Sequence, residues 1–340
     1  MAIIGTNCNL KSFDWIPLST LRNEEDRAKI CSPDTVPRLA REEIYVSDIQ
    51  KKWNEDFDPT KVQSRRMIDS LGTPFPYKSS TTGIEYMGYL VVPSDINFET
   101  KEKLPVVVIF HTGAGPQDIF NRFQADKIAR EKVWGDKGCI VLVADLLSDS
   151  VGWTWGDRDR YWKARKDLFE VIERDNMKRR WRLRDALSAM IEAVGQIKEA
   201  GLIIAFGFCM GGNPAIELAR MKPKNLKGIV TFHGLFDGVE LSEMESQSKN
   251  LGKTLICHGL KDPWVPIDDV EKAVDTFNWC GYKTKLLKFE NAQHNFSNPR
   301  THYDDSKGFG YDEEASSKSW EEAMILIKSV LALEENKGEV

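Results

Sequence analysis

The chain has 340 residues, of which 41% are hydrophobic and 29% charged, with a net charge of −5 and a pI of about 5.7. This acidic balance argues against a nucleic-acid partner, and no apolar run reaches the roughly 18 residues that a membrane helix needs. The first eight residues lack the basic segment and apolar core of a secretory signal, and the six cysteines follow no regular framework. We therefore expect a cytoplasmic protein with free thiols, a monomer or homodimer, with no nucleic-acid and no membrane partner.

Residues 1–76 are polar, rich in proline and without a chemical motif. Because they also contain large aromatic residues such as Trp15 and Trp53, we expect an N-terminal extension packed on the main domain rather than a disordered tail. The main domain is predicted to span residues 77–340.

Strand and helix patterns alternate through the main domain. A segment of alternating polarity that ends at proline, 84–93, is typical of an antiparallel edge strand. Apolar runs predict further strands at 104–110, 139–144, 202–206, 228–233, 254–258 and 284–290, and helical patterns occupy 119–132, 163–197, 270–279 and 319–333. This alternation predicts an α/β fold, a doubly wound and mostly parallel sheet with helices on both faces.

Residues 150–200 depart from this alternation and are predicted to form a helical, Trp-rich insertion that covers the site. Trp153, Trp155 and Arg158 lie at its start, where aromatic and charged residues are interleaved. They are candidates for binding an anionic substrate by stacking and by guanidinium hydrogen bonds, and the alternative is a solvated, charged helix face.

The most informative stretch is Gly207-Phe-Cys-Met-Gly-Gly212, which lies between an apolar strand and a helical pattern. Strand, sharp turn and helix are typical of the nucleophile elbow of an α/β-hydrolase, here with Cys209 where serine is usual. Gly207 and Gly211 suit this turn, because the crowded neighbours of a nucleophile on a strained turn cannot carry side chains. The N–H of Met210 would then stabilise an oxyanion from a helix start. Taken alone, the motif also fits a buried core cysteine beside a glycine turn.

Candidate partners of Cys209 follow the next strands of the chain. In a doubly wound sheet the site forms at the carboxyl ends of the strands. Asp237 follows the first strand after the elbow, Asp262 the second and His294 the third. The order nucleophile, acid, histidine is that of α/β-hydrolases. The sequence therefore predicts a Cys209–His294–Asp262 triad, with Asp237 as the rival acid; His294 would move the proton and Asp262 would fix its tautomer.

The loop after Phe110 is expected to complete the site. The backbone N–H of Thr112 or Gly113 is the candidate second oxyanion donor, and His111 is a candidate substrate contact. His111 and His258 both end strands that point at the site, but no ligand spacing supports a metal, so hydrogen-bonded structural histidines are the expectation.

Three motifs together resemble the dienelactone hydrolase family: Gly-Phe-Cys-Met-Gly-Gly (207–212), His-Gly-Leu-Lys-Asp-Pro-Trp-Val-Pro (258–266) and Ala-Gln-His-Asn-Phe (292–296). Residues 311–320 also look like the lead-in to that family's C-terminal helix, so the resemblance spans roughly residues 77–332. It implies a cofactor-free hydrolase that opens enol-lactones such as dienelactones, with Cys209, Asp262 and His294 as triad and Met210 as one oxyanion donor.

The chain departs from the family pattern at two places. Thr112 stands where many members carry a glutamate that helps to form the thiolate, and Asn298 stands where the substrate-carboxylate arginine would lie, with Arg300 two residues further on. We therefore expect a hydrolase of this type that acts on a small lactone or activated ester through a cysteinyl acyl-enzyme. The alternatives are a carboxylesterase or thioesterase with a larger substrate, and a catalytically silent scaffold that binds a ligand or partner.

Overall fold

The computed structural model describes residues 72–92, 103–113, 115–116, 119–148, 158–174, 177–237, 247–299, 301 and 308–335. The predicted N-terminal extension falls almost entirely outside these described residues. The chain divides into two compact units, Met1–Leu202 and Ile203–Val340.

The first unit contributes four strands in the order β1 (Thr73–Lys78), β2 (Glu85–Val91), β4 (Ile140–Ala144) and β3 (Leu104–Phe110). β1 pairs with β2 and β2 with β4 in antiparallel fashion, and β3 and β4 are parallel. The prediction that residues 84–93 form an edge strand is therefore wrong, although the antiparallel direction is correct. The edge is β1, where Pro74 and Pro76 are tolerated because an outer strand does not need every N–H for pairing.

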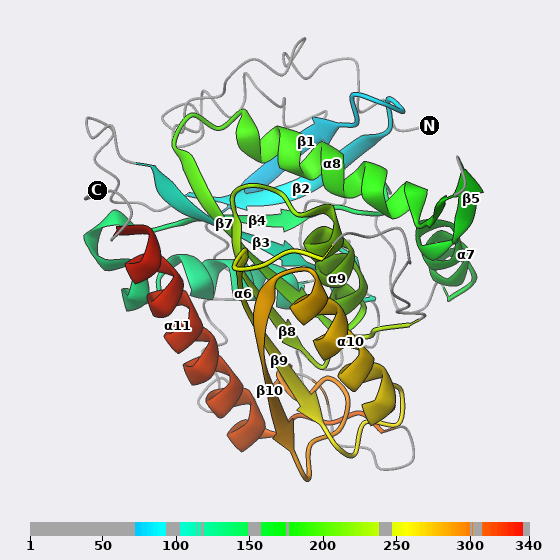
Figure 1. The fold of residues 1–340 in the computed structure, drawn as a ribbon, viewed down its shortest axis with the longest axis vertical. Helices are drawn as coiled ribbons and strands as arrows, with labels where there is room; N and C mark the ends of the chain where they lie inside the picture. The colour runs from blue at the N-terminus through cyan, green and yellow to red at the C-terminus, as the bar shows by residue number, and fades with distance from the viewer. Residues whose placement is uncertain are drawn as a thin grey trace. The chain divides into compact units, whose positions relative to one another are not determined.

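Helices cover this unit on both sides of its strands. α6 (Ile119–Ala129) packs on β2, β3 and β4, while α8 (Trp181–Gly195) packs on β1 from the opposite face (Figure 1). A short 3₁₀ helix (Lys132–Lys137) follows α6, and α7 (Arg158–Phe169) precedes α8. The predicted helical stretch 163–197 is interrupted by an antiparallel hairpin of β5 (Ile172–Arg174) and β6 (Met177–Arg179), which the helical pattern did not indicate.

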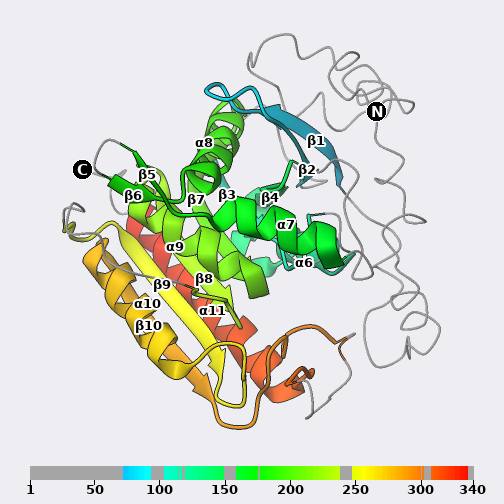
Figure 2. The same ribbon diagram turned by 90° about the vertical axis from the view of Figure 1, so that its right-hand side faces the viewer.

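The second unit is a run of parallel strands joined by helices. β7 (Ala200–Phe208, beginning at the end of the first unit), β8 (Leu226–Phe232), β9 (Gly252–Gly259) and β10 (Tyr282–Phe289) are neighbours in chain order. α9 (Gly212–Met221) and α10 (Ile267–Trp279) pack on one face and α11 (Glu313–Glu335) on the other (Figure 2). Because the strands are parallel, the loops after β7, β9 and β10 all leave from the same edge of the sheet.

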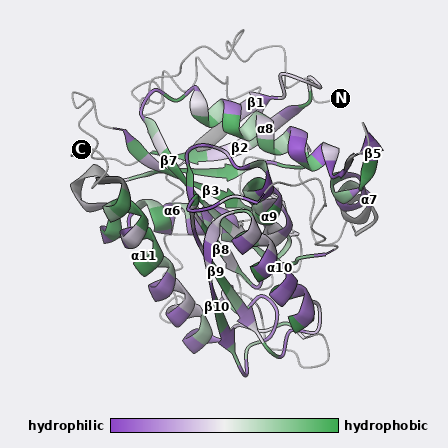
Figure 3. Ribbon diagram, viewed as in Figure 1, coloured by the Kyte–Doolittle hydropathy of each residue, from purple (hydrophilic) through white to green (hydrophobic). Residues whose placement is uncertain are grey.

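The core consists of continuous apolar strands. Every residue of Val106–Phe110 and of Ile140–Ala144 is 0% exposed, and the same strands appear hydrophobic in Figure 3 while the outer face of α10 is hydrophilic. Burial on both faces requires such unbroken runs. The strand pairings within the units are mostly parallel and each unit has helices on both faces of its strands, so the predicted fold class is confirmed. No helix in the described ranges is both long and apolar enough to cross a membrane.

Candidate active site

Cys209 stands on a strained turn between β7 and α9. Its φ is +53°, in the left-handed region that residues with a side chain rarely adopt, and it opens a 3₁₀ turn, Cys209–Gly211, that leads directly into α9. Such backbone conformations cost about 1–3 kcal/mol and persist where the surrounding structure enforces them. The strand–turn–helix arrangement that the sequence predicted is therefore present, with the cysteine at its sharpest point.

Two glycines make room for this turn. A Cβ added to Gly207 would lie 2.4 Å from the carbonyl oxygen of Gly211, and one added to Gly212 would lie 2.6 Å from that of Leu235. Both obstacles are backbone atoms, which cannot rotate away. The Leu235 N–H also donates a 2.8 Å hydrogen bond to the carbonyl of Cys209. The crowding at Gly207 was predicted; that at Gly212 comes from the loop after β8, which sequence spacing does not reveal.

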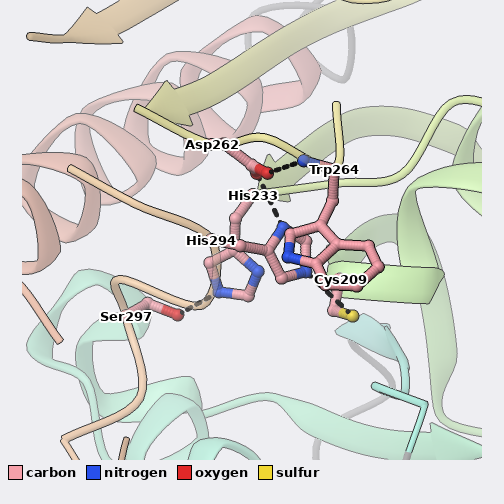
Figure 4. A network of polar contacts seen from close by, with 6 residues as sticks. All are labelled: Cys209, His233, Asp262, Trp264, His294 and Ser297. Atoms are coloured by element: carbon pink, nitrogen blue, oxygen red, sulfur yellow. Dashed lines mark hydrogen bonds and ion pairs between the residues drawn. The ribbon is translucent and has the colours of Figure 1, made fainter. Parts of the chain in front are cut away.

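The structure brings together the three residues of the predicted triad (Figure 4). The Nδ1 of His294 lies 2.6 Å from Oδ2 of Asp262, and its Nε2 lies 3.2 Å from Sγ of Cys209. All three side chains are buried and all belong to the second unit. Both ring nitrogens of one histidine are thus occupied, one by an acid and one by a thiol.

The electrostatics of this group favour charge separation. Burial by itself would lower the pKa of His294, but the negative charge of Cys209 and the hydrogen bonds from His294 to Asp262 and Cys209 outweigh it and raise that pKa from 6.5 to about 10. At neutral pH this raised pKa favours a protonated imidazole at His294.

Asp262 is held in place by its own turn. Its Oδ1 accepts a 2.8 Å hydrogen bond from the N–H of Trp264, and its backbone N–H donates to the carbonyl of Gly259 at 3.1 Å. Its other oxygen is thereby directed at His294. Asp262, and not its rival Asp237, is the carboxylate that contacts Nδ1 of His294.

Comparison with known proteins assigns the family. The model of the dienelactone hydrolase family matches residues 88–331, more than two thirds of the chain. The chain belongs to the dienelactone hydrolase family. It is accordingly a hydrolase of ester or lactone bonds, as the resemblance of its motifs implied.

The following relative and solved structures are similar to the chain at low sequence identity. The uncharacterized protein K02A2.1 of Caenorhabditis elegans is 24% identical over 156 residues, which are 45% of this chain and 98% of that protein. The structure named m3DLH is similar with a TM-score of 0.58 and 23% identity, covering 76% of this chain and 98% of its own. The structure of the dienelactone hydrolase-like promiscuous phosphotriesterase P91 from metagenomic libraries is similar with a TM-score of 0.57 and 23% identity, and it has the same coverage of both chains. The structure of a putative dienelactone hydrolase of Klebsiella pneumoniae is similar with a TM-score of 0.53 and 16% identity, covering 75% of this chain and 98% of its own. At these identities the structural likenesses show the fold alone.

The oxyanion donors expected in this dienelactone hydrolase family member lie in different units. Met210 is the second residue of the 3₁₀ turn after Cys209, and the first N–H groups of a helix have no acceptor within it. Thr112 and Gly113 follow β3 in the first unit, where both are buried. The carbonyl of Thr112 lies 2.8 Å from Nδ1 of His111, and burial lowers the pKa of His111 to about 4 despite this hydrogen bond. The oxyanion roles remain predictions.

Most of the predicted substrate contacts cannot be placed. Trp153, Trp155 and Arg300 lie outside the described residues, and Arg158 begins α7 but its side chain is not described. Their roles stay predictions. Within the part of the chain that is described, no three His, Cys, Asp or Glu side chains are arranged to hold a metal ion.

Sequence reasoning overlooked part of the shell around His294. The ring of His233 lies 5.3 Å from the His294 ring, and the ring of Phe309 lies 5.3 Å from it at 89°. His233 is in turn hydrogen-bonded to Ser297. The only sequence signal was that His233 is the last residue of the predicted strand 228–233, on the same edge as the triad.

Proposed function

We propose that this chain hydrolyses a small lactone or activated ester with Cys209 as the nucleophile, through a cysteinyl acyl-enzyme. The observation that carries the proposal is the pair of distances at His294, 3.2 Å to Sγ of Cys209 and 2.6 Å to Oδ2 of Asp262. A thiol, a base and an acid that orients the base constitute an activated nucleophile.

Acylation would begin when the sulfur of Cys209 attacks the carbonyl carbon of the substrate. A C–S bond forms and the carbonyl electron pair moves onto oxygen, where the N–H of Met210, and an N–H of Thr112 or Gly113, would stabilise the charge. The intermediate collapses with loss of the alkoxide, and His294 donates its Nε2 proton to that oxygen. The products are a thioester on Cys209 and an alcohol, which in a lactone remains part of the same acyl group.

Deacylation would use the same histidine as a base. His294, now neutral, takes a proton from water while the oxygen of that water attacks the thioester carbonyl. The second tetrahedral intermediate expels the sulfur as thiolate, and the acid product leaves. Asp262 stabilises the positive charge on His294 and keeps its tautomer fixed, so the cycle ends with the ion pair restored.

The nucleophile limits the substrate. In the first tetrahedral intermediate the sulfur competes with the substrate oxygen as leaving group, and the group of lower pKa leaves faster. An enolate or phenolate can compete with a thiolate, whereas a plain alkoxide cannot. Activated acyl groups, such as enol-lactones and aryl esters, are therefore favoured over alkyl esters and amides.

The test combines turnover with trapping of the intermediate. Wild type, Cys209→Ala and Cys209→Ser are assayed on an enol-lactone, an aryl ester, an alkyl ester and an acyl thioester, and acid-quenched samples are mapped by peptide mass. We expect an acyl adduct on the Cys209 peptide, no turnover by Cys209→Ala and reduced turnover by Cys209→Ser. Cys280→Ala, which removes another buried thiol of the same unit, is the matched control and should behave as wild type.

The panel also discriminates the alternatives. Turnover by Cys209→Ala equal to that of wild type would refute the nucleophile. Preference for the thioester alone would favour a thioesterase, and a wild-type protein without turnover or adduct on any substrate would favour a binding scaffold.

A further inference from the structure

A second histidine, His233, is built into the wall of the site without belonging to the triad. It follows β8 directly, is 0% exposed, and has a φ of +41°, a left-handed conformation that residues other than glycine rarely adopt. Its backbone N–H donates a 2.9 Å hydrogen bond to the carbonyl of Cys257 on the neighbouring strand. The backbone strain is therefore retained at a position that fixes one particular side chain, which is a pattern typical of functional sites.

The side chain of His233 contacts the loop that carries the catalytic histidine. Its Nε2 lies 2.8 Å from Oγ of Ser297. The centroid of its ring lies 5.3 Å from that of His294, with an interplanar angle of 66°, and 5.2 Å from that of Phe296, with an interplanar angle of 87°. Figure 4 shows His233 between Ser297 and His294. One side chain directly after β8 thus contacts three residues of the loop after β10.

The loop after β10 is held at His294 itself by residues 308–310: the N–H of His294 donates to the carbonyl of Gly308 at 3.0 Å, and its carbonyl accepts from the N–H of Gly310 at 3.1 Å. Asp262 holds Nδ1 of the ring. Asn295, the next residue, has a φ of +65°, so the chain turns sharply just after His294. The N–H of Asn298 closes this turn onto the carbonyl of Asn295 at 3.0 Å, and the His233–Ser297 hydrogen bond joins the turn to the end of β8.

His233 is suited to this place because it carries no charge. Burial, followed by the positive charge of His294, lowers its pKa well below the usual value. A lysine or arginine here would oppose the positive charge that His294 must hold beside the sulfur. A neutral imidazole offers a hydrogen bond to Ser297 and a flat ring edge to His294 without that cost.

We propose that His233 is a positioning residue: through Ser297 and its ring contact it holds the imidazole of His294 at hydrogen-bond distance from Cys209 and from the leaving oxygen. The inference rests on the proposed function, because it assigns His233 a role through His294. Misplacement of a catalytic group by about 1 Å can cost roughly 100-fold in rate. Loss of the His233–Ser297 contact is therefore expected to change kcat rather than substrate affinity.

Four variants test the positioning role of His233. His233→Leu removes both nitrogens, Ser297→Ala removes the partner hydroxyl, and His233→Gln places an amide nitrogen near the position of Nε2. Thr231→Val, a nearly isosteric change of another buried polar side chain on β8, is the matched control. Each variant is measured for kcat, KM, thermal unfolding, and the pH dependence of Cys209 alkylation by iodoacetamide.

We expect His233→Leu and Ser297→Ala each to lower kcat by about 10–100-fold, with KM within twofold of wild type. The kcat of the double variant should be no lower than that of the less active single variant, because both substitutions remove the same contact. His233→Gln should recover most of the activity, and Thr231→Val should match wild type. The alkylation midpoint should move toward that of a free thiol in His233→Leu, a change that a loss of stability alone does not produce.

Wild-type kcat and an unshifted alkylation profile in folded His233→Leu would overturn the proposal. If that variant does not fold, Ser297→Ala decides the matter, since it removes a single hydroxyl, and full kcat there is equally decisive. Failure of the proposed function is distinguishable from this result, because it shows as turnover by Cys209→Ala or as a wild type without turnover or adduct.

Discussion

The strongest consequence of the site geometry concerns the reactivity of Cys209 when its histidine is removed. In wild type, Nε2 of His294 lies 3.2 Å from Sγ, and the pKa of His294 is raised from 6.5 to about 10. The direction of that shift favours the protonated imidazole, and the charge of Cys209 is one of its main causes. His294→Gln keeps the approximate shape of the side chain but removes the positive charge. We predict that Cys209 then behaves as an ordinary thiol.

The magnitude follows from the ionised fraction. A free thiol with a pKa of about 8.5 is only about 0.3% thiolate at pH 6. If at least half of Cys209 is thiolate at that pH in wild type, the variant has roughly 150-fold less. A stabilised thiolate is also a weaker nucleophile, with a Brønsted slope of about 0.4–0.5, which removes about tenfold of this advantage. We therefore expect wild type to be alkylated roughly tenfold faster than His294→Gln at pH 6, and the advantage to shrink as the pH approaches 8.5.

The assay is the rate of iodoacetamide alkylation between pH 5 and 10. Peptide mapping separates Cys209 from the five other cysteines of the chain. Equal rates for wild type and His294→Gln at pH 6, with both profiles centred near pH 8.5, would refute the ion pair. The thiol would then be at rest in the free protein, and the proposed mechanism would need another group to form the thiolate.

Three further predictions test the site and its scaffold. Asp262→Asn should lower kcat by about 10³–10⁴-fold, because an amide no longer selects the correct tautomer of the histidine. The kcat of Asp237→Asn should stay near that of wild type. Both are measured by steady-state kinetics, and equal losses of kcat would count against Asp262 as the acid. Gly207→Ala should destabilise the fold by about 3 kcal/mol through its backbone clash, while Gly195→Ala, whose Cβ would meet nothing within 4 Å, should stabilise it by about 0.5–1 kcal/mol; both are read from urea unfolding. Burial raises the pKa of Asp145 from 3.8 to about 6, so its contribution to stability is greatest below pH 3.8 and is lost as the pH rises through 6. The unfolding free energy of wild type should change by about 3 kcal/mol more over this range than that of Asp145→Asn, with more stability at the acid end, and identical pH slopes would contradict the shift.

The central elements could be predicted from sequence because their signals are local. A short, β-branched apolar run such as Val106–Phe110 is typical of a strand buried on both faces, and glycines around a lone cysteine between strand and helix indicate an elbow. Asp262 and His294 were found because parallel strands place their carboxyl ends on one edge, so a residue's position after a strand predicts its location at the site.

Other features depended on contacts that local patterns do not encode. Pro74 and Pro76 do not fit the pattern of a strand, so β1 was not predicted and β2 was mistaken for the edge strand. Gly212 is confined by Leu235, a residue of a different loop, and spacing within the elbow motif does not report that approach.

The sequence by itself therefore determined the α/β class, the elbow with Cys209, the candidate histidine His294 and two candidate acids, since each follows from a periodicity or from a position after a strand. Only the tertiary structure decided that Asp262 rather than Asp237 contacts His294. It also revealed that His233 and Ser297, 64 residues apart, are joined by a hydrogen bond next to the candidate catalytic histidine, His294. The physical reason is that a hydrogen bond depends on where two side chains meet in space, which the packing of strands and loops fixes.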